Sequence, residues 1–311
     1  MKISVDGGGL GGKLGERFGN YVFSENLIRA LSLYDKKNKY HIYTFDRLKP
    51  RLAWSKIRLS LEEFKEKKDV FLALNQAIPL YVSEKIISFC HGLSYYFYPR
   101  LYSKKDYSRL MNQLKEMIKR SDYIVVSSEK VKKELVLINQ LTDTKIVVIP
   151  FGIPIDMSTR STPGEYTCKY FLYVGMKHSI KNIRFIRKAF EKFREIREFR
   201  DYQLILITKN CSRKKLRNLY RGATALLTAS HYESFNLPVL EALSLGCPVV
   251  GLKSAIIPEL QPYVNLANNQ KEFIDCMYKV INQKKDFTLI KRLIKVFSWK
   301  NYVEKLVKLY K

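Results

Sequence analysis

The chain has 311 residues, of which 46% are hydrophobic and 27% are charged, and its formal net charge is +27. This length and hydrophobic content exclude a wholly disordered chain and allow two domains with buried cores. No apolar run is long enough for a membrane-spanning helix, and the first residues lead directly into a predicted strand, so we expect no signal peptide. Five scattered cysteines without a Cys-x-x-Cys motif indicate reduced thiols in a cytoplasmic protein.

The positive charge is spread over both halves of the chain and does not form a tail. Such a charge attracts anionic partners, a description that fits nucleic acid, an anionic membrane surface and phosphorylated substrates. The charge alone leaves these three classes of partner open.

A strand, a glycine-rich loop, a helix and a second strand open the chain. Lys2–Val5 and Tyr40–Phe45 have strand patterns, and the segment 20–33 between them has a helical pattern. This order is typical of the beginning of a parallel α/β domain.

The sequence of the glycine-rich loop, residues 7–15, partly matches two phosphate-binding motifs but fulfils neither. Asp46 lies too far beyond Gly12 for a dinucleotide fingerprint, and Leu14 stands where a P-loop requires Ser or Thr. Two interpretations stay open: a flexible turn, or a loop whose backbone N–H groups approach a pyrophosphate.

The segment from Arg47 to Asp69 mixes basic side chains with apolar ones such as Leu52, Trp54 and Ile57. This pattern predicts either a domain helix with a solvated basic face or an amphipathic helix that rests on a membrane surface. The strand Lys85–Phe89 follows.

That strand places His91 at its carboxyl end, where open α/β sheets bind ligands. The aromatic run Tyr95–Tyr98 comes next and suits either packing or the acceptor side of a cleft. Further on, the helix Tyr107–Arg120 and the strand Lys145–Pro150 continue the α/β pattern.

The second half restarts with the strand Tyr170–Val174, followed by a loop that contains Lys177 and Lys181. A strand at 203–208 then leads almost directly into the helix Leu216–Tyr220.

The most informative stretch runs from residue 225 to residue 252. A strand, Ala225–Ala229, enters a polar turn; Pro238 then suits the first turn of a helix, and the strand Val249–Leu252 follows. Glu233 lies in the turn and Glu241 near the start of the helix. A helix N-terminus suits a phosphate, and a nearby carboxylate can accept hydrogen bonds from a ribose diol. Alternatively, both glutamates simply complement the helix dipole.

The sequence of residues 230–251 resembles the donor-site motif of family 4 glycosyltransferases, Ser-x-x-Glu-Gly-Phe-Gly-Leu-Pro-x-x-Glu-Ala. Ser234 and Asn236 replace the two glycines of that motif. Weaker similarities to the family run along most of the chain, at residues 19–31, 121–129, 151–154, 258–260 and 297–302.

This resemblance implies an α/β protein with two Rossmann-like domains that face each other across a cleft, the GT-B arrangement. Residues 1–154 would form the acceptor-side domain, with a C-terminal helix, 297–311, packing back on it. Residues 155–296 would form the nucleotide-sugar-binding domain. We expect that domain to be pared down, because the family's strand before the helix Leu216–Tyr220 is missing.

The resemblance also assigns site residues. The implied catalytic residues are Glu233, His91 and Lys181, of which Lys181 matches the family's diphosphate-binding lysine. Met176 stands where relatives have an arginine, so Lys177 is offered as its substitute, and His91 is followed by Gly where the family has Asp. The implied nucleotide-sugar-binding residues are Glu241, Lys181, Lys177, Gly12, Gly19, Ser234, Phe235, Asn236 and Leu237.

The implied reaction is transfer of a hexose, with retention, from a UDP- or GDP-linked sugar to a saccharide, lipid-linked or protein acceptor. We expect no cofactor and no metal, since the sequence shows no ligand cluster beside its many cations. We expect a cytoplasmic protein and no nucleic-acid partner. The positive charge has two possible explanations: the protein binds peripherally to an anionic membrane, or the charge serves only solubility. Three other functions stay open: nucleic-acid binding on a degenerate transferase fold, an NAD-dependent oxidoreductase, and a sugar-phosphate synthase or phosphorylase, which the short chain without large insertions disfavours.

Overall fold

The computed structural model describes residues 1–11, 19–45, 53–82, 85–139, 143–157, 168–209, 211–283 and 286–311. The chain divides into two compact units. Unit 1 contains Met1–Gly152 and Trp299–Lys311, and unit 2 contains Ile153–Ser298. Unit 2 is therefore one continuous stretch of sequence, whereas unit 1 is made from two.

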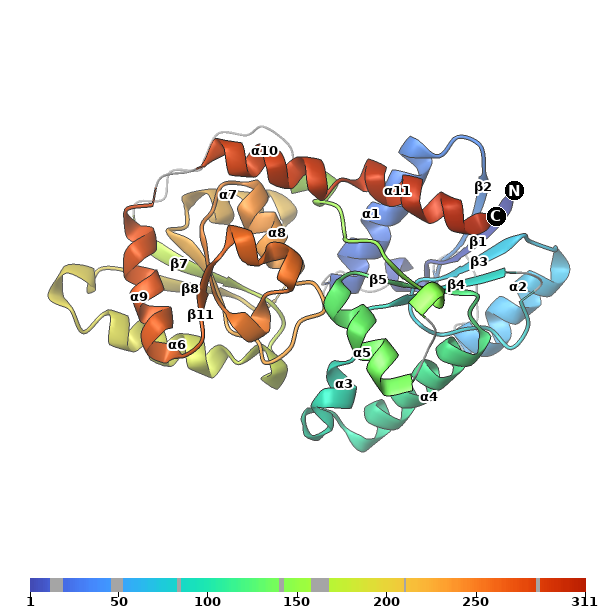
Figure 1. Ribbon diagram of the computed structural model, residues 1–311, viewed down its shortest axis with the longest axis horizontal. Coiled ribbons are helices and arrows are strands. Elements are labelled where there is room, and N and C mark those ends of the chain that lie inside the picture. The colour runs from blue at the N-terminus through green and yellow to red at the C-terminus, as the bar shows by residue number, and fades with distance from the viewer. Residues whose placement is uncertain are drawn as a thin grey trace. The chain divides into compact units, whose positions relative to one another are not determined.

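Unit 1 is built on a six-stranded sheet in the order β2-β1-β3-β4-β5-β6, in which every neighbouring pair is parallel (Figure 1). The strands are β1 Lys2–Asp6, β2 Lys39–Tyr43, β3 Val70–Ala73, β4 Lys85–Cys90, β5 Tyr123–Val126 and β6 Ile146–Val148. All four side chains of β3 are buried, as expected for a central strand of a parallel sheet with both faces covered.

Helices cover both faces of this sheet. Among the described residues they are α1 Gly19–Tyr34, α2 Leu59–Lys65, α3 Ser94–Phe97, α4 Lys104–Arg120, α5 Glu129–Asn139 and α11 Trp299–Val307. α2, α4 and α5 contribute side chains to one core cluster, and α1 packs against α11 (Figure 1).

The last residues of the chain complete unit 1. Trp299, at the start of α11, lies directly against Gly152, and its ring packs on Tyr302 with ring centroids 5.1 Å apart. Beyond α11, the hydroxyl groups of Tyr310 and Tyr40 lie 3.3 Å apart, and Tyr40 donates a hydrogen bond to Asp35. The C-terminal segment is thus tied to α1 and β2.

The segment with basic and apolar side chains differs from a single amphipathic helix. Residues 46–52, which include Arg47, Lys49 and Arg51, lie outside the described residues. From Trp54 onward the chain forms a π-helical turn, Trp54–Arg58, followed by α2. Trp54 points inward, is 7% exposed and donates from Nε1 to Asp6 Oδ1 at 3.1 Å, because its indole N–H needs a partner once buried. Trp54 is therefore a core residue and unsuited to insertion into a membrane.

Unit 2 is built on a five-stranded sheet in the order β11-β10-β9-β7-β8, again parallel throughout (Figure 1). The strands are β7 Tyr170–Val174, β8 Gln203–Ile207, β9 Ala225–Thr228, β10 Val249–Leu252 and β11 Asn265–Ala267. α6 Ile183–Phe193 and α9 Gln270–Ile281 share a core cluster with the strands. α8 Leu237–Ser244 contacts β9 and β10 and packs against α7 Arg213–Gly222 and α10 Phe287–Val296.

Both units therefore have the two-sided parallel α/β architecture that the sequence predicts. Within the described parts of the chain, none of the helices combines the length and apolar character needed to cross a bilayer.

Candidate functional site

The turn between β9 and α8 carries four of the predicted site residues, Glu233, Ser234, Phe235 and Asn236. Asn236 precedes the helix in the left-handed conformation, with φ 73°, and Pro238 lies in the first helical turn. The Asn236 side-chain amide donates to Thr228 Oγ1 and to the Ala255 carbonyl, both at 3.1 Å. Asn is among the few residues that adopt this conformation readily, which explains how it replaces a motif glycine.

Buried side chains and a backbone hydrogen bond fix the other residues around this turn. Phe235 is 1% exposed and packs edge-on against Phe297 at 6.0 Å between ring centroids, and Leu237 is also buried. Ser234 is partly exposed. The backbone N–H of His231 donates to the Ile180 carbonyl at 2.8 Å, which joins this turn to the segment that contains Lys181.

Lys181 and Glu233 form an ion pair. Lys181 Nζ lies 2.6 Å from Glu233 Oε1, and the same oxygen accepts a hydrogen bond from Ser230 Oγ at 2.7 Å. Both side chains are partly accessible, at 23% for Lys181 and 11% for Glu233. A cation and a carboxylate, 52 residues apart in the sequence, are therefore in contact and open to solvent on one side.

The loop that carries Lys181 begins at the carboxyl end of β7. Lys177 is exposed in this loop, and Lys181 closes a short 3-10 turn, Ser179–Lys181. At the start of the loop, Gly175 lies so close to the Tyr173 hydroxyl that an added Cβ would be 2.7 Å from it. That hydroxyl is buried without a hydrogen-bond partner among the described residues, and burial, with a smaller contribution from Glu233, raises the pKa of Tyr173.

Glu241 has a different environment from Glu233. It lies within α8, is 3% exposed, and both of its oxygens are engaged: Oε1 accepts from Arg213 Nη2 at 2.8 Å and Oε2 from the Tyr220 hydroxyl at 2.9 Å. Arg213 also holds Asp156, through Nε to Oδ2 at 2.5 Å and Nη2 to Oδ1 at 3.0 Å. The predicted ribose-binding carboxylate is thus part of a four-residue polar cluster.

Burial is the main influence on the titration of this cluster. Desolvation raises the pKa of Glu241, although the charge of Arg213 and the hydrogen bonds from Arg213 and Tyr220 oppose the shift. Burial and the neighbouring Glu241 charge raise the pKa of Tyr220 well above its ordinary value, so this phenol stays protonated and acts as a donor.

Two predicted site residues belong to unit 1, and a third lies outside the described residues. His91 follows β4, where its Nε2 lies 2.6 Å from the Leu74 carbonyl and its ring packs edge-on against Phe23. Burial lowers the pKa of His91, so the imidazole is neutral at pH 7 and donates from Nε2. Gly19 begins α1 with φ 23°. Gly12 is the residue outside the described part of the chain.

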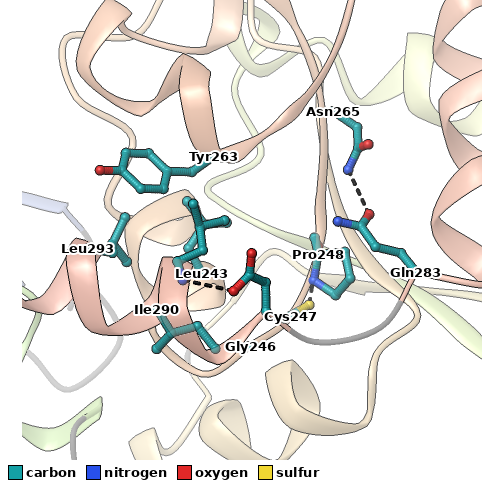
Figure 2. Close-up of a pocket in the computed structure, with 11 residues that line it drawn as sticks. Leu243, Gly246, Cys247, Pro248, Tyr263, Asn265, Gln283, Ile290 and Leu293 are labelled. Atoms are coloured by element: carbon teal, nitrogen blue, oxygen red, sulfur yellow. Dashed lines mark hydrogen bonds between the residues drawn. The ribbon is translucent and has the colours of Figure 1, made fainter.

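A small pocket lies at the end of α8 that is remote from the motif turn (Figure 2). Its volume of about 40 Å³ is far below the several hundred Å³ typical of a nucleotide-sized ligand site. Figure 2 shows Asn265 hydrogen-bonded to Gln283 on one side of it, at 3.1 Å. This pocket is therefore unsuited to the donor. Its lining residues are Leu243, Gly246, Cys247, Pro248, Tyr263, Asn265, Gln283, Asp286, Leu289, Ile290 and Leu293.

Sequence reasoning missed the partners of the two glutamates. Ser230 is part of the motif and could have been identified by its position three residues before Glu233. Arg213, Tyr220 and Asp156 had no such signal, because they are 28, 21 and 85 residues from Glu241 in the chain and only the fold brings them together.

Comparison with known proteins finds similarity in the segment that contains this site. Residues 202–265, which contain the motif turn and every element from β8 to β10, match the family described as glycosyl transferases group 1. A probable sucrose-phosphate synthase from Thermosipho melanesiensis is 25% identical over 236 residues, covering 63% of this chain. The match spans 55% of that relative, so the chain covers only about half of its length.

Two further proteins extend the comparison over more of the chain. The O-antigen chain mannosyltransferase B of Escherichia coli is 25% identical over 272 residues, or 73% of this chain and 70% of that protein. The structure of Anabaena Alr3699/HepE in complex with UDP and glucose superposes over 99% of this chain and 98% of that one, with a TM-score of 0.67 at 12% identity, which shows a shared fold. The segment around Glu233 and Glu241 is therefore similar to group 1 glycosyl transferases, and the chain shares its fold with solved structures of glycosyltransferases.

Proposed function

We propose that the chain is a family 4 retaining hexosyltransferase that uses a UDP- or GDP-linked donor and a saccharide, lipid-linked or protein acceptor. The observation that carries the proposal is the Lys181–Glu233 pair beside the N-terminus of α8, because Glu233 lies within the segment that matches group 1 glycosyl transferases. The complex of the Anabaena protein with UDP and glucose supports this class of donor.

The donor diphosphate would bind where positive charge and backbone N–H groups converge. Lys181 supplies a compact cation, exposed Lys177 a second one from the same loop, and the first residues of α8 the positive end of a helix. These groups stabilise the negative charge that develops on the leaving phosphate. Glu233 holds Lys181 in place before the donor arrives, and Glu241 would accept hydrogen bonds from the ribose.

The reaction consists of one bond broken and one bond formed at the anomeric carbon. The bond between the sugar and the phosphate oxygen breaks, and the acceptor oxygen bonds to the same face of the sugar, so configuration is retained. The acceptor proton passes to the departing phosphate oxygen.

Nucleotide binding tests the donor assignment. Calorimetric titration with UDP and with GDP should detect binding of at least one of them. Glu241→Ala and Lys181→Ala should each weaken it by about 1–3 kcal/mol, the cost of losing a charge-assisted hydrogen bond. Glu198→Ala, a change at an exposed carboxylate in the same unit, is the matched control and should bind as the parent does. Unchanged affinity in folded Glu241→Ala and Lys181→Ala would contradict the assignment.

We also propose that transfer proceeds without a divalent metal, since lysines and N–H groups neutralise the diphosphate. Donor hydrolysis or transfer should be the same after dialysis against EDTA and after later addition of magnesium or manganese. Turnover that disappears with EDTA and returns with either ion would show that a metal takes part.

The acceptor side of the proposal includes docking on an anionic membrane. Unit 1 exposes an apolar surface, the Phe64 patch, defined as Ile57, Leu61, Phe64, Leu80 and Tyr81, with exposures of 45–76%. Two contacts bring residues 80–81 beside the segment 56–64: the ring centroids of Phe64 and Tyr81 are 5.7 Å apart, and the Leu80 backbone N–H donates a hydrogen bond to the Lys56 carbonyl.

Cations accompany this patch. Arg120 donates to the carbonyls of Pro79 and Leu80. Lys56 and Lys65, the sequence neighbours of Ile57 and Phe64, pair with Glu116 and Glu62. Exposed rings and aliphatic side chains beside lysine and arginine suit the headgroup region of an anionic bilayer, where each cation contributes about 1 kcal/mol.

Vesicle co-sedimentation tests the docking proposal. Binding to vesicles rich in phosphatidylglycerol should exceed binding to phosphatidylcholine vesicles, should fall with added salt, and should drop several-fold in Leu61→Ser/Phe64→Ser. Leu137→Ser, at a side chain that is 78% exposed on α5, is the control and should bind as the parent does. Equal binding to both vesicle types at low salt would contradict docking, and so would a change of oligomeric state in the double variant, which would indicate a second copy as the occupant.

A further inference from the structure

Arg213 occupies a central place in the polar cluster around Glu241. It begins α7, and only residues 208–212 separate it from the end of β8, so the short connection delivers its guanidinium beside α8. From this position Arg213 contacts Asp156 through two parallel hydrogen bonds and Glu241 through a third. A bidentate guanidinium pair is geometrically specific, and its orientation is therefore fixed.

The burial of Glu241 makes this contact important. A carboxylate that is 3% exposed would lose its charge in an apolar environment unless a cation or several donors compensated for its lost hydration. The charged and titratable groups that face it are Arg213 and Tyr220 from α7 and, beyond Arg213, Asp156, which opposes ionisation; Cys247 lies near Tyr220. Arg213 is the one cation among these groups.

The ionised form of Glu241 is the one that can bind a diol. A carboxylate has about four acceptor positions, and Arg213 and Tyr220 occupy one on each oxygen, so two acceptor positions remain. Protonation would convert one of them into a donor. If the Glu241 carboxylate could rotate freely, both remaining acceptor positions would also lose their alignment with the diol.

We infer that Arg213 is a positioning residue for donor recognition: it keeps Glu241 ionised and oriented so that its remaining acceptor positions receive the two ribose hydroxyls. This inference rests on the proposed function, since it needs a nucleotide at Glu241. It assigns the ribose preference to the Asp156–Arg213–Glu241 arrangement as a unit.

The test compares each ribonucleotide with its 2′-deoxy form, because both carry the same diphosphate. UDP and 2′-deoxy-UDP, and GDP and 2′-deoxy-GDP, are titrated calorimetrically from about pH 5.5 to 8.5, the range in which a raised carboxyl pKa would appear. The parent should prefer the ribonucleotide about tenfold at every pH. In Arg213→Gln the preference should fall below about twofold at low pH and recover at high pH, as Glu241 loses its proton.

Two further variants sharpen the result. Arg217→Gln is the matched control: Arg217 lies one turn further along α7 and contacts only the backbone carbonyl of Asp156 in that cluster, so the preference should stay at the parent value. Arg213→Lys keeps the charge and loses the two-pronged contact. It should show a preference that does not vary with pH and is about threefold weaker than the parent's, the scale of one lost neutral hydrogen bond.

The outcomes separate the two proposals. If neither nucleotide binds the parent, or if Glu241→Ala keeps the ribose preference, the donor site itself is wrongly placed. If Glu241→Ala abolishes the preference while Arg213→Gln keeps it at every pH, only the role of Arg213 is overturned. Should Arg213→Gln fail to fold by circular dichroism, Arg213→Lys decides, and a preference equal to the parent's would overturn the inference.

Discussion

Asn236 combines two properties that neither glycine nor alanine has together. Its φ of 73° lies in the left-handed region, and its side chain ties the turn before α8 to Thr228 and Ala255. Glycine at this position would keep the backbone conformation and lose the ties, whereas alanine would lose the ties and strain the backbone.

This difference gives a prediction for two single substitutions. Asn236→Gly and Asn236→Ala remove the same hydrogen bonds, so their difference reports the strain alone. Asn236→Ala should have a free energy of unfolding about 1–2 kcal/mol lower than Asn236→Gly, measured by urea titration. At Ser234, which is not among the residues with positive φ, alanine should be at least as stable as glycine. Equal stability of the two Asn236 variants would show that the turn relaxes into another conformation.

At the scale of elements, α11 depends on close contact with the segment that leaves unit 1. A Cβ at Gly152 would lie 2.6 Å from two atoms of the Trp299 ring and 2.7 Å from the Trp299 backbone nitrogen. The ring could turn away, but the backbone nitrogen belongs to the start of the helix and can move only with it. Glycine is therefore required here by the approach of another chain segment.

Gly152→Ala should accordingly lower the free energy of unfolding by about 1–3 kcal/mol, the usual cost of overpacking. Gly175→Ala is a useful comparison, because its added Cβ would meet the hydroxyl of Tyr173 rather than backbone. Adding Tyr173→Phe should recover part of the loss in Gly175→Ala, whereas Trp299→Phe should recover little in Gly152→Ala. Thermal unfolding of the four variants checks both statements, and full recovery in Gly152→Ala/Trp299→Phe would contradict the first.

Local sequence patterns were sufficient to predict most strands of the two sheets. The strands Tyr170–Val174 and Val249–Leu252 are confirmed with the predicted bounds, since apolar runs between turn residues mark them clearly. β3, Val70–Ala73, was not predicted: its four apolar residues lack the alternation that distinguishes a strand from a helix segment.

The candidate site was predictable only in part, for a related reason. Glu233, Glu241 and Pro238 lie within one short motif, so their spacing could be read along the chain. The contacts of Lys181 with Glu233 and of Arg213 with Glu241 join residues 52 and 28 positions apart. No local pattern encodes such pairs, and the roles proposed for these residues remain predictions.

At the scale of the whole molecule, the dominant property is charge. With 56 basic and 29 acidic side chains, like charges repel across the surface and oppose the compact state. Ion pairs within α2 and between Lys56 and Glu116 offset only a small part of this repulsion, because exposed pairs contribute little.

The melting temperature should therefore rise when sodium chloride is increased from about 10 mM to about 150 mM, as the Debye length shortens from about 30 Å to about 8 Å. Scanning calorimetry at constant pH measures the change. A melting temperature that falls over this range would show that ion pairs outweigh the general repulsion, and the same scan with sodium fluoride separates screening from specific anion binding.

The division of unit 1 into two stretches of sequence sets an order of events on the ribosome. Residues 1–152 emerge before unit 2, but the helix that packs on α1 belongs to the segment Trp299–Lys311, which emerges after unit 2. Unit 2 is continuous, so all of its residues leave the exit tunnel while unit 1 still lacks α11. Since domains generally fold as units during synthesis, unit 2 is expected to fold first, and the α1 surface stays uncovered until translation has passed Trp299.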